Sequence, residues 1–156
     1  MQKGFALIET IIYIALFSIL MTSGFVATYQ IISSADLLNQ KNRTEEEGNF
    51  VLRKMSWSFA GLDAGIIPTV SGSGCSQSIS ISKTNTANPI RIRTNVTAGV
   101  NYLEIQDDGV TYYPLTTINA STSCLKFSII SGNPYGIIAT TTINGKDFVI
   151  KKYARL

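Results

Sequence analysis

Apolar side chains are unevenly distributed along this chain of 156 residues. The longest uncharged stretch lies between Glu9 and Asp36, and most of it is apolar. As an α-helix, residues 10–32 would be roughly 35 Å long, at about 1.5 Å per residue. That length is sufficient to cross the apolar core of a bilayer. The pattern therefore predicts a helix near the N-terminus that is long enough to span a membrane.

The hydrophobic pattern changes after this stretch but remains helical. Residues 33–47 are polar and contain no proline, which is typical of a solvated continuation of the same helix. One helical face then carries four apolar residues, Val51, Met55, Phe59 and Leu62. We expect one helix from about Phe5 to about Gly61, apolar in its first half and amphipathic in its second. Gly24 and Gly48 are the positions at which it would bend or loosen.

The remainder of the chain alternates apolar and polar residues in short runs, which is typical of β-strands. Turns are indicated at Asp107–Gly109 and at Asn144–Gly145, the second being the stronger hairpin signal. These patterns predict the α+β class, with an antiparallel sheet whose apolar face packs against the amphipathic half of the helix. The expected strands are 77–82, 90–96, 100–106, 110–115, 124–130, 137–143 and 146–153.

Composition argues against most catalytic chemistry. The chain has no histidine, which is the commonest general base and metal ligand, and its net charge is only +3. The SGSG run at 71–74 lacks the Lys-Ser/Thr of a phosphate-binding loop. Asp107 and Asp108 could offer oxygens to calcium, but a turn explains them more simply. We therefore expect no enzymatic activity, no metal and no cofactor.

The two cysteines, Cys75 and Cys124, both lie outside the apolar stretch. If this part of the chain is exported from the cytoplasm, they are candidates for a disulfide. The alternative is a pair of unbonded, buried cysteines that act as small hydrophobic residues.

The position of Glu9 separates three interpretations of the N-terminus. A cleaved secretory signal would need a shorter apolar core and a small-residue cleavage site. A plain single-pass anchor fits the length, and Lys3 would stay on the cytoplasmic side. However, an anchor has no use for Glu9, because a carboxylate inside a bilayer costs a few kcal/mol and is usually functional.

The third interpretation explains the acid, because residues 3–9 (KGFALIE) resemble the processing signature of type IV pilins and type II secretion pseudopilins. The resemblance implies a short leader with the basic residue Lys3, and cleavage between Gly4 and Phe5 by a prepilin peptidase that also N-methylates Phe5. It further implies that Glu9 pairs with the amine of Phe5 on a neighbouring subunit. Ala6 departs from the family pattern, in which Thr or Ser is common.

The resemblance also implies an organisation and a location. The protein would be a structural subunit that assembles with other pilin subunits, anchored first in the cytoplasmic membrane with its head outside. It would then join an extracellular or periplasmic filament. The segments expected are a leader (1–4), a transmembrane or filament-core helix (5–32), a helix continuation (33–62) and a β-rich globular head (63–156).

The kind of filament remains open at this point. Asn49, Phe50 and Leu52 resemble an N-x-F-x-L pattern of larger minor pilins and of one minor pseudopilin, which favours a minor subunit; Phe50 and Leu52 keep the F-x-L spacing, and Asn49 lies directly before Phe50. The alternatives are a secretion pseudopilin and a DNA-binding tip pilin for competence. A DNA-binding role would use basic side chains near aromatic ones, and the candidates are Arg91, Arg93, Lys146, Lys151, Lys152 and Arg155.

Overall fold

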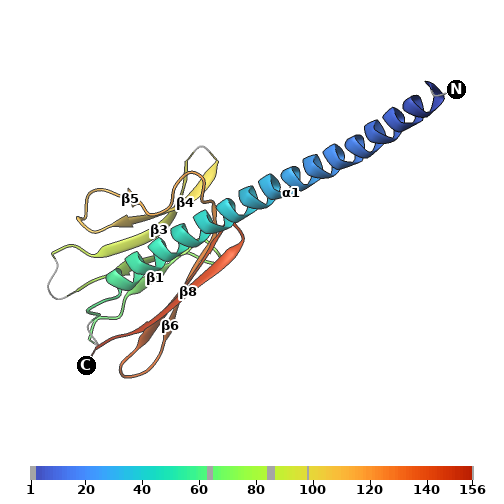
Figure 1. Cartoon of the computed structure of the whole chain (residues 1–156). Helices are drawn as coiled ribbons and strands as arrows, with labels where there is room; N and C mark the ends of the chain where they lie inside the picture. The colour runs from blue at the N-terminus through green and yellow to red at the C-terminus, as the bar shows by residue number, and fades with distance from the viewer. Residues whose placement is uncertain (1–2, 63–64, 84–86, 98, 156) are drawn as a thin grey trace. The chain divides into compact units, whose positions relative to one another are not determined.

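The computed structural model describes residues 3–62, 65–83, 87–97 and 99–155 (Figure 1). Two compact units, Met1–Asn42 and Arg43–Leu156, make up the chain. The helix α1 (Lys3–Ser58) forms the described part of the first unit and begins the second. Eight strands follow it: β1 (Thr69–Ser71), β2 (Ser78–Ile81), β3 (Ile90–Thr97), β4 (Val100–Gln106), β5 (Tyr113–Pro114), β6 (Thr122–Ile130), β7 (Gly136–Ile143) and β8 (Lys146–Tyr153).

The first unit presents its side chains outward. Every side chain described between residues 7 and 42 is exposed, including the large apolar ones. The hydroxyl groups in this segment bond to the helix itself, because Ser18 Oγ donates to Ile14 O and Thr28 Oγ1 donates to Gly24 O. Such back-bonding satisfies a hydroxyl that lacks water. The apolar surface therefore has no partner among the described residues.

The second half of α1 has a buried face, as the spacing predicts. Val51, Met55, Phe59 and Leu62 are each at most 2% exposed, which confirms the expected apolar row. The helix ends at Ser58, slightly earlier than Gly61. The backbone of Phe59 still donates to Met55 O, and Gly61 then adopts a left-handed φ of 72°, a conformation common just after a helix.

The strands form two antiparallel sheets rather than the single sheet that the sequence suggests. β1 to β5 make one sheet in consecutive order, and β6 to β8 make the other. The α+β class is confirmed, but the number of sheets is corrected. β5 has only two residues, so it offers too short an edge to the nine residues of β6. β6 pairs with β7 instead and begins a second sheet.

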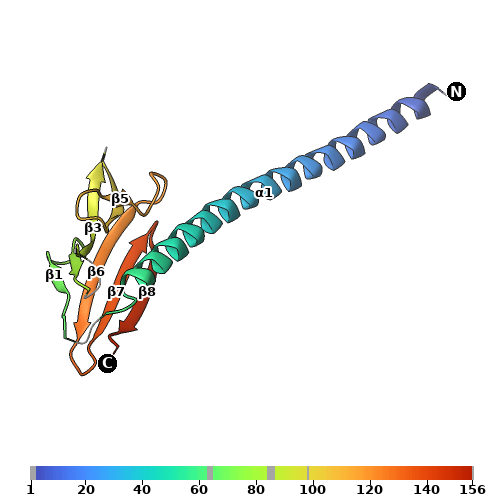
Figure 2. The same cartoon turned by 90° about the vertical axis from the view of Figure 1, so that its left-hand side faces the viewer.

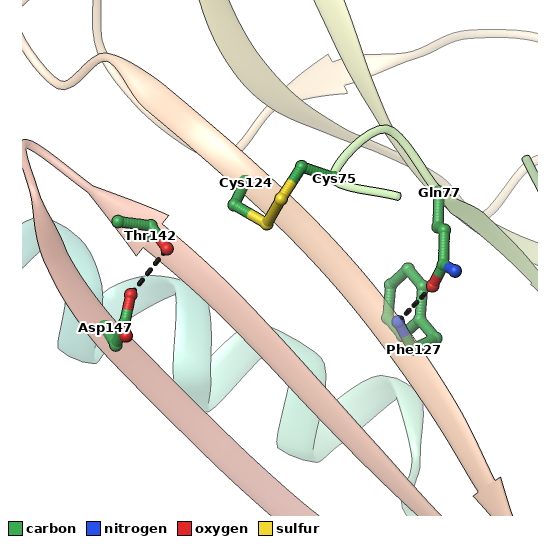
Figure 3. Close-up of a disulfide and its surroundings, with 6 residues drawn as sticks. All are labelled: Cys75, Gln77, Cys124, Phe127, Thr142 and Asp147. Carbon is green, nitrogen blue, oxygen red and sulfur yellow. Dashed lines mark hydrogen bonds between the residues drawn. A yellow bond between two sulfur atoms is a disulfide. The ribbon is translucent and has the colours of Figure 1, made fainter. Parts of the chain in front are cut away.

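A short segment before β2 joins the two sheets along the free edge of β6. Figure 2 shows β6 at the edge of its own sheet, between β7 and the strands of the other sheet. The backbone of Gln77 donates to Leu125 O, and the backbone of Leu125 donates to Cys75 O. The side chain of Gln77 also accepts a hydrogen bond of 2.6 Å from the backbone of Phe127 (Figure 3). These bonds satisfy backbone groups that an unpaired edge would leave open.

Both sheets contribute apolar side chains to one core against the second half of α1. In Figure 1 this part of the helix lies across the strands of the head. Three polar pairs tie α1 to the β7–β8 turn, to the first residue of β8 and to the loop before β6: Thr44 with Asn144, Glu45 with Lys146, and Glu47 with Thr117. The strand residues of the core are Ile79, Ile81, Ile90, Ile92, Leu103, Ile105, Leu125, Phe127, Ile137, Ala139, Ile143 and Phe148.

Gly48 packs directly against an aromatic side chain of the second sheet. A Cβ atom built on Gly48 would overlap the ring of Phe148, which lies on β8. In contrast, a Cβ on Gly24 would meet nothing within 4 Å. The two glycines were expected to bend the helix, but Gly48 has a different reason to be there, since it leaves room for an aromatic ring.

We expect Gly48→Ala to lower the free energy of unfolding of the head by about 1–3 kcal/mol, because overpacking displaces Phe148. The better helix propensity of alanine, worth about 1 kcal/mol, offsets only part of this cost. Denaturant unfolding of the full chain in detergent, followed by the fluorescence of the single tryptophan, measures it. Gly24→Ala is the matched control and should leave this transition unchanged. Equal midpoints for the two variants would contradict the packing argument.

Candidate functional site

The carboxylate of Glu9 lies on the exposed apolar part of α1. Tyr13, one turn later, donates a hydrogen bond of 3.1 Å from its Oη to Glu9 Oε1. Within the described residues no hydrogen bond engages the second oxygen, Oε2. Because a phenol is neutral, Tyr13 can satisfy part of the carboxylate in an apolar setting without adding a charge. The acid therefore keeps one oxygen available for a further partner.

The helix around Glu9 is suited to a lipid or a helix-bundle environment. α1 contains an 18-residue window with a mean hydropathy of 2.0 and is long enough to cross a membrane. A carboxylate placed in such surroundings needs a partner that offsets its desolvation. The side chains of Lys3 and Phe5 lie outside what the structure describes, although the backbone of residues 3–5 is helical.

Cys75 and Cys124 form a disulfide in this structure, with a Cα–Cα distance of 4.4 Å (Figure 3). The bond joins the segment before β2 to β6, at the same junction that the Gln77 hydrogen bonds stabilise. The two residues are 49 positions apart in the sequence, so the bond closes a long loop. The disulfide therefore links the two sheets covalently.

The six basic candidates for DNA binding come from both sheets. Arg91 and Arg93 lie on β3, whereas Lys146, Lys151 and Lys152 lie on β8. Arg155 follows β8, and its backbone donates to Leu62 O. Lys146 forms an ion pair with Glu45, and Arg93 forms one with Glu104. The structure does not bring the six together on one strand or one sheet, and two of them already have acidic partners.

Glu104 is a buried acid that the sequence analysis did not single out. It lies opposite Arg93 in the β3–β4 register, at an Nη2–Oε2 distance of 3.1 Å, and it also accepts a hydrogen bond from Asn95. The guanidinium of Arg93 in turn lies 3.6 Å from the ring centroid of Tyr112. The sequence could have indicated this pair if the strands at 90–97 and 100–106 had been paired as a hairpin. Arg93 and Glu104 then lie opposite each other, and opposite charges at such positions are favourable.

The turn after β4 is held by the side chain of Asp108. Its Oδ1 accepts hydrogen bonds of 2.8 Å from the backbones of Val110 and Thr111. These bonds lower the pKa of the Asp108 carboxyl, with the bond from Thr111 contributing most. Asn88 donates to Asp108 O at 2.6 Å.

Among the described residues no three acidic, histidine or cysteine side chains form a group that could hold a metal ion.

Comparison with known proteins assigns the N-terminus alone. Residues 1–25 match the family described as the prokaryotic N-terminal methylation motif. No curated protein and no solved structure gives a significant match to the chain. The matched segment contains Gly4, Phe5 and Glu9, and it ends within the exposed apolar part of α1.

We expect replacement of both Cys75 and Cys124 by serine to lower the free energy of unfolding of the head by about 2–4 kcal/mol, since the unfolded chain regains the entropy of a long loop. Denaturant unfolding of the full chain with and without a thiol reductant measures the effect. The reductant should shift the wild-type transition but leave that of the double variant in place. A wild-type transition that is insensitive to reductant after complete reduction would contradict the expectation.

Proposed function

We propose, on the premise that residues 1–25 carry the N-terminal signal of type IV pilins and type II secretion pseudopilins, that this chain is the precursor of a filament subunit. Its role is structural. It supplies one helix to the filament core and displays a β-rich head. The sequence supports a non-enzymatic role, because it contains no histidine, the commonest general base.

Processing comes first in this proposal. A prepilin peptidase removes residues 1–4 by cleavage between Gly4 and Phe5 and then methylates the new amine of Phe5. Lys3 belongs to the leader and stays on the cytoplasmic side of the membrane. The match to the methylation motif supports this step.

The observation that carries the proposal is the apolar helix of residues 5–32, in which Glu9 is the one charged residue. Its carboxylate is exposed. Bundling such helices removes their apolar surface from both water and lipid. The ammonium of Phe5 on a neighbouring subunit then pairs with Glu9, and each charge offsets part of the desolvation of the other. A subunit added in the wrong register leaves the acid unpaired, so Glu9 also selects the register.

The location follows from the same segment. Before assembly the helix 5–32 anchors the subunit in the cytoplasmic membrane, while the continuation 33–62 and the head 63–156 lie outside. The Cys75–Cys124 disulfide supports this orientation, because disulfides persist in oxidising compartments. After assembly the subunit belongs to an extracellular or periplasmic filament.

We favour a minor pilin, on the resemblance of Asn49, Phe50 and Leu52 to the pattern of larger minor subunits. A type II secretion pseudopilin shares the same signal and differs in its machine, so the neighbouring genes separate the two. DNA capture is the weaker alternative, because the six basic candidates are divided between two sheets and two of them form ion pairs.

We expect Glu9→Ala to be inserted and processed normally but to enter filaments at least about tenfold less than the wild type, because the neighbouring ammonium loses its partner. The ratio of mature subunit in sheared filaments to that in membranes measures this. Ser18→Ala changes another polar residue of the same helix and should assemble normally. If Glu9→Ala assembled as well as Ser18→Ala, the register argument would fail.

We expect Gly4→Val to block cleavage, because a β-branched side chain at the scissile bond obstructs the peptidase. Intact-mass spectrometry should find the variant with residues 1–4 attached, whereas the wild type begins at a methylated Phe5. Wild-type protein from native membranes that begins at Met1 or Gln2 would overturn the assignment of the cleavage site.

A further inference from the structure

An exposed side of α1, distinct from the buried row, carries a cationic-aromatic face, formed by Phe50, Lys54 and Trp57 together with Lys83. The three helix residues recur at i, i+4 and i+7, so they share one face. The Nζ of Lys54 lies 5.8 Å from the ring centroid of Phe50 and 6.0 Å from that of Trp57. Lys83 lies 5.4 Å from the Trp57 ring, and burial lowers its pKa.

This face is exposed, although aromatic rings are usually buried. Trp57 is 51% exposed and Phe50 is 39% exposed, whereas Val51 and Met55 of the buried row are fully buried. Within the described chain Lys54 contacts rings but forms no ion pair. An exposed tryptophan beside lysines fits a partner that offers acidic groups and an apolar side chain at close range.

The same chain presents such a partner in its acidic turn, residues 107–110, which follows β4. Asp107 and Asp108 are exposed, and Val110 is 83% exposed. The turn is fixed in shape, because Asp108 Oδ1 holds two backbone amides and Asn88 donates to Asp108 O. Asp107 forms no ion pair with any described residue. A rigid protrusion of this kind loses little conformational entropy when it binds.

We propose that the acidic turn of one copy of this chain docks on the cationic-aromatic face of a second copy. In this contact Asp107 approaches Lys54, and Val110 packs against the ring of Trp57. The proposal rests on the proposed function, because it describes how heads meet in a filament. It goes beyond that function by naming a contact that the N-terminal signal does not specify.

A second copy is the favoured occupant for two reasons. Both surfaces belong to the unit Arg43–Leu156, yet one lies on α1 and the other in the loop after β4, so a single copy presents both halves of the contact. Two different patches that complement each other make a heterologous contact, and such a contact builds an open filament when the rotation between copies does not close a ring. Helix bundling would also hold neighbouring heads at a high effective concentration.

A charge exchange on the full-length protein tests the contact. We expect Lys54→Glu and Asp107→Lys each to lower the ratio of filament to membrane subunit roughly two- to fivefold. The double variant should recover most of the loss, because it restores opposite charges. Trp57→Ala should lower the ratio by about tenfold or more, as for a central aromatic contact residue. Lys126→Glu, an exposed charge reversal on β6, is the matched control and should assemble normally.

The outcomes separate this inference from the proposed function. If wild-type protein forms filaments and both single reversals assemble like Lys126→Glu, the contact is wrong while the function stands. If Lys54→Glu is impaired but Asp107→Lys is not, the face binds a different partner, and the inference is overturned. The same holds if both singles are impaired and the double variant does not recover. If wild-type protein enters no filament, or Glu9→Ala enters as well as wild type, it is the proposed assembly that fails.

Discussion

A single row of apolar side chains on α1 closes the core of the head, because both sheets bury their inner faces against it. Each sheet is a meander whose strands are neighbours in sequence, and the two share little backbone pairing beyond the junction at Gln77 and Leu125. Without the row around Met55, both inner faces would be open to water. The second half of α1 therefore belongs to the same compact unit as the head, and this unit begins at Arg43.

The two halves of α1 satisfy different environments with the same backbone geometry. In the second half, packing against the sheets contributes most of the stability of the helix. Polar pairs such as Glu45 with Lys146 also attach this half of α1 to the strands. In the first half no described residue covers the apolar side chains, so their burial requires lipid or other helices. Glu9 is the exception in that half, and its bond to Tyr13 shows how a helix can carry an acid where water is scarce.

Local patterns along the chain predicted most of the elements, and the long-range arrangement escaped them. The row that includes Val51 and Met55 follows from helical spacing, and the Asn144–Gly145 turn follows from residues that tolerate a positive φ. The strands divide into two sheets because β5 has only two residues. The alternation of apolar and polar residues in the sequence does not indicate that this strand is short. The role of Gly48 depends on Phe148, a residue 100 positions away, and only the folded chain brings them together.

The Asn144–Gly145 turn has a practical consequence for labelling this protein. Hairpin tips are commonly chosen for inserted tags because they are exposed and tolerant. Here the side chain of Asn144 accepts a hydrogen bond from the backbone of Ser121 and donates others to Thr44 and to Asn119 O. An epitope inserted at this tip would detach the hairpin from both the helix and the preceding loop. The turn that is easiest to recognise in the sequence is thus a poor place to interrupt it.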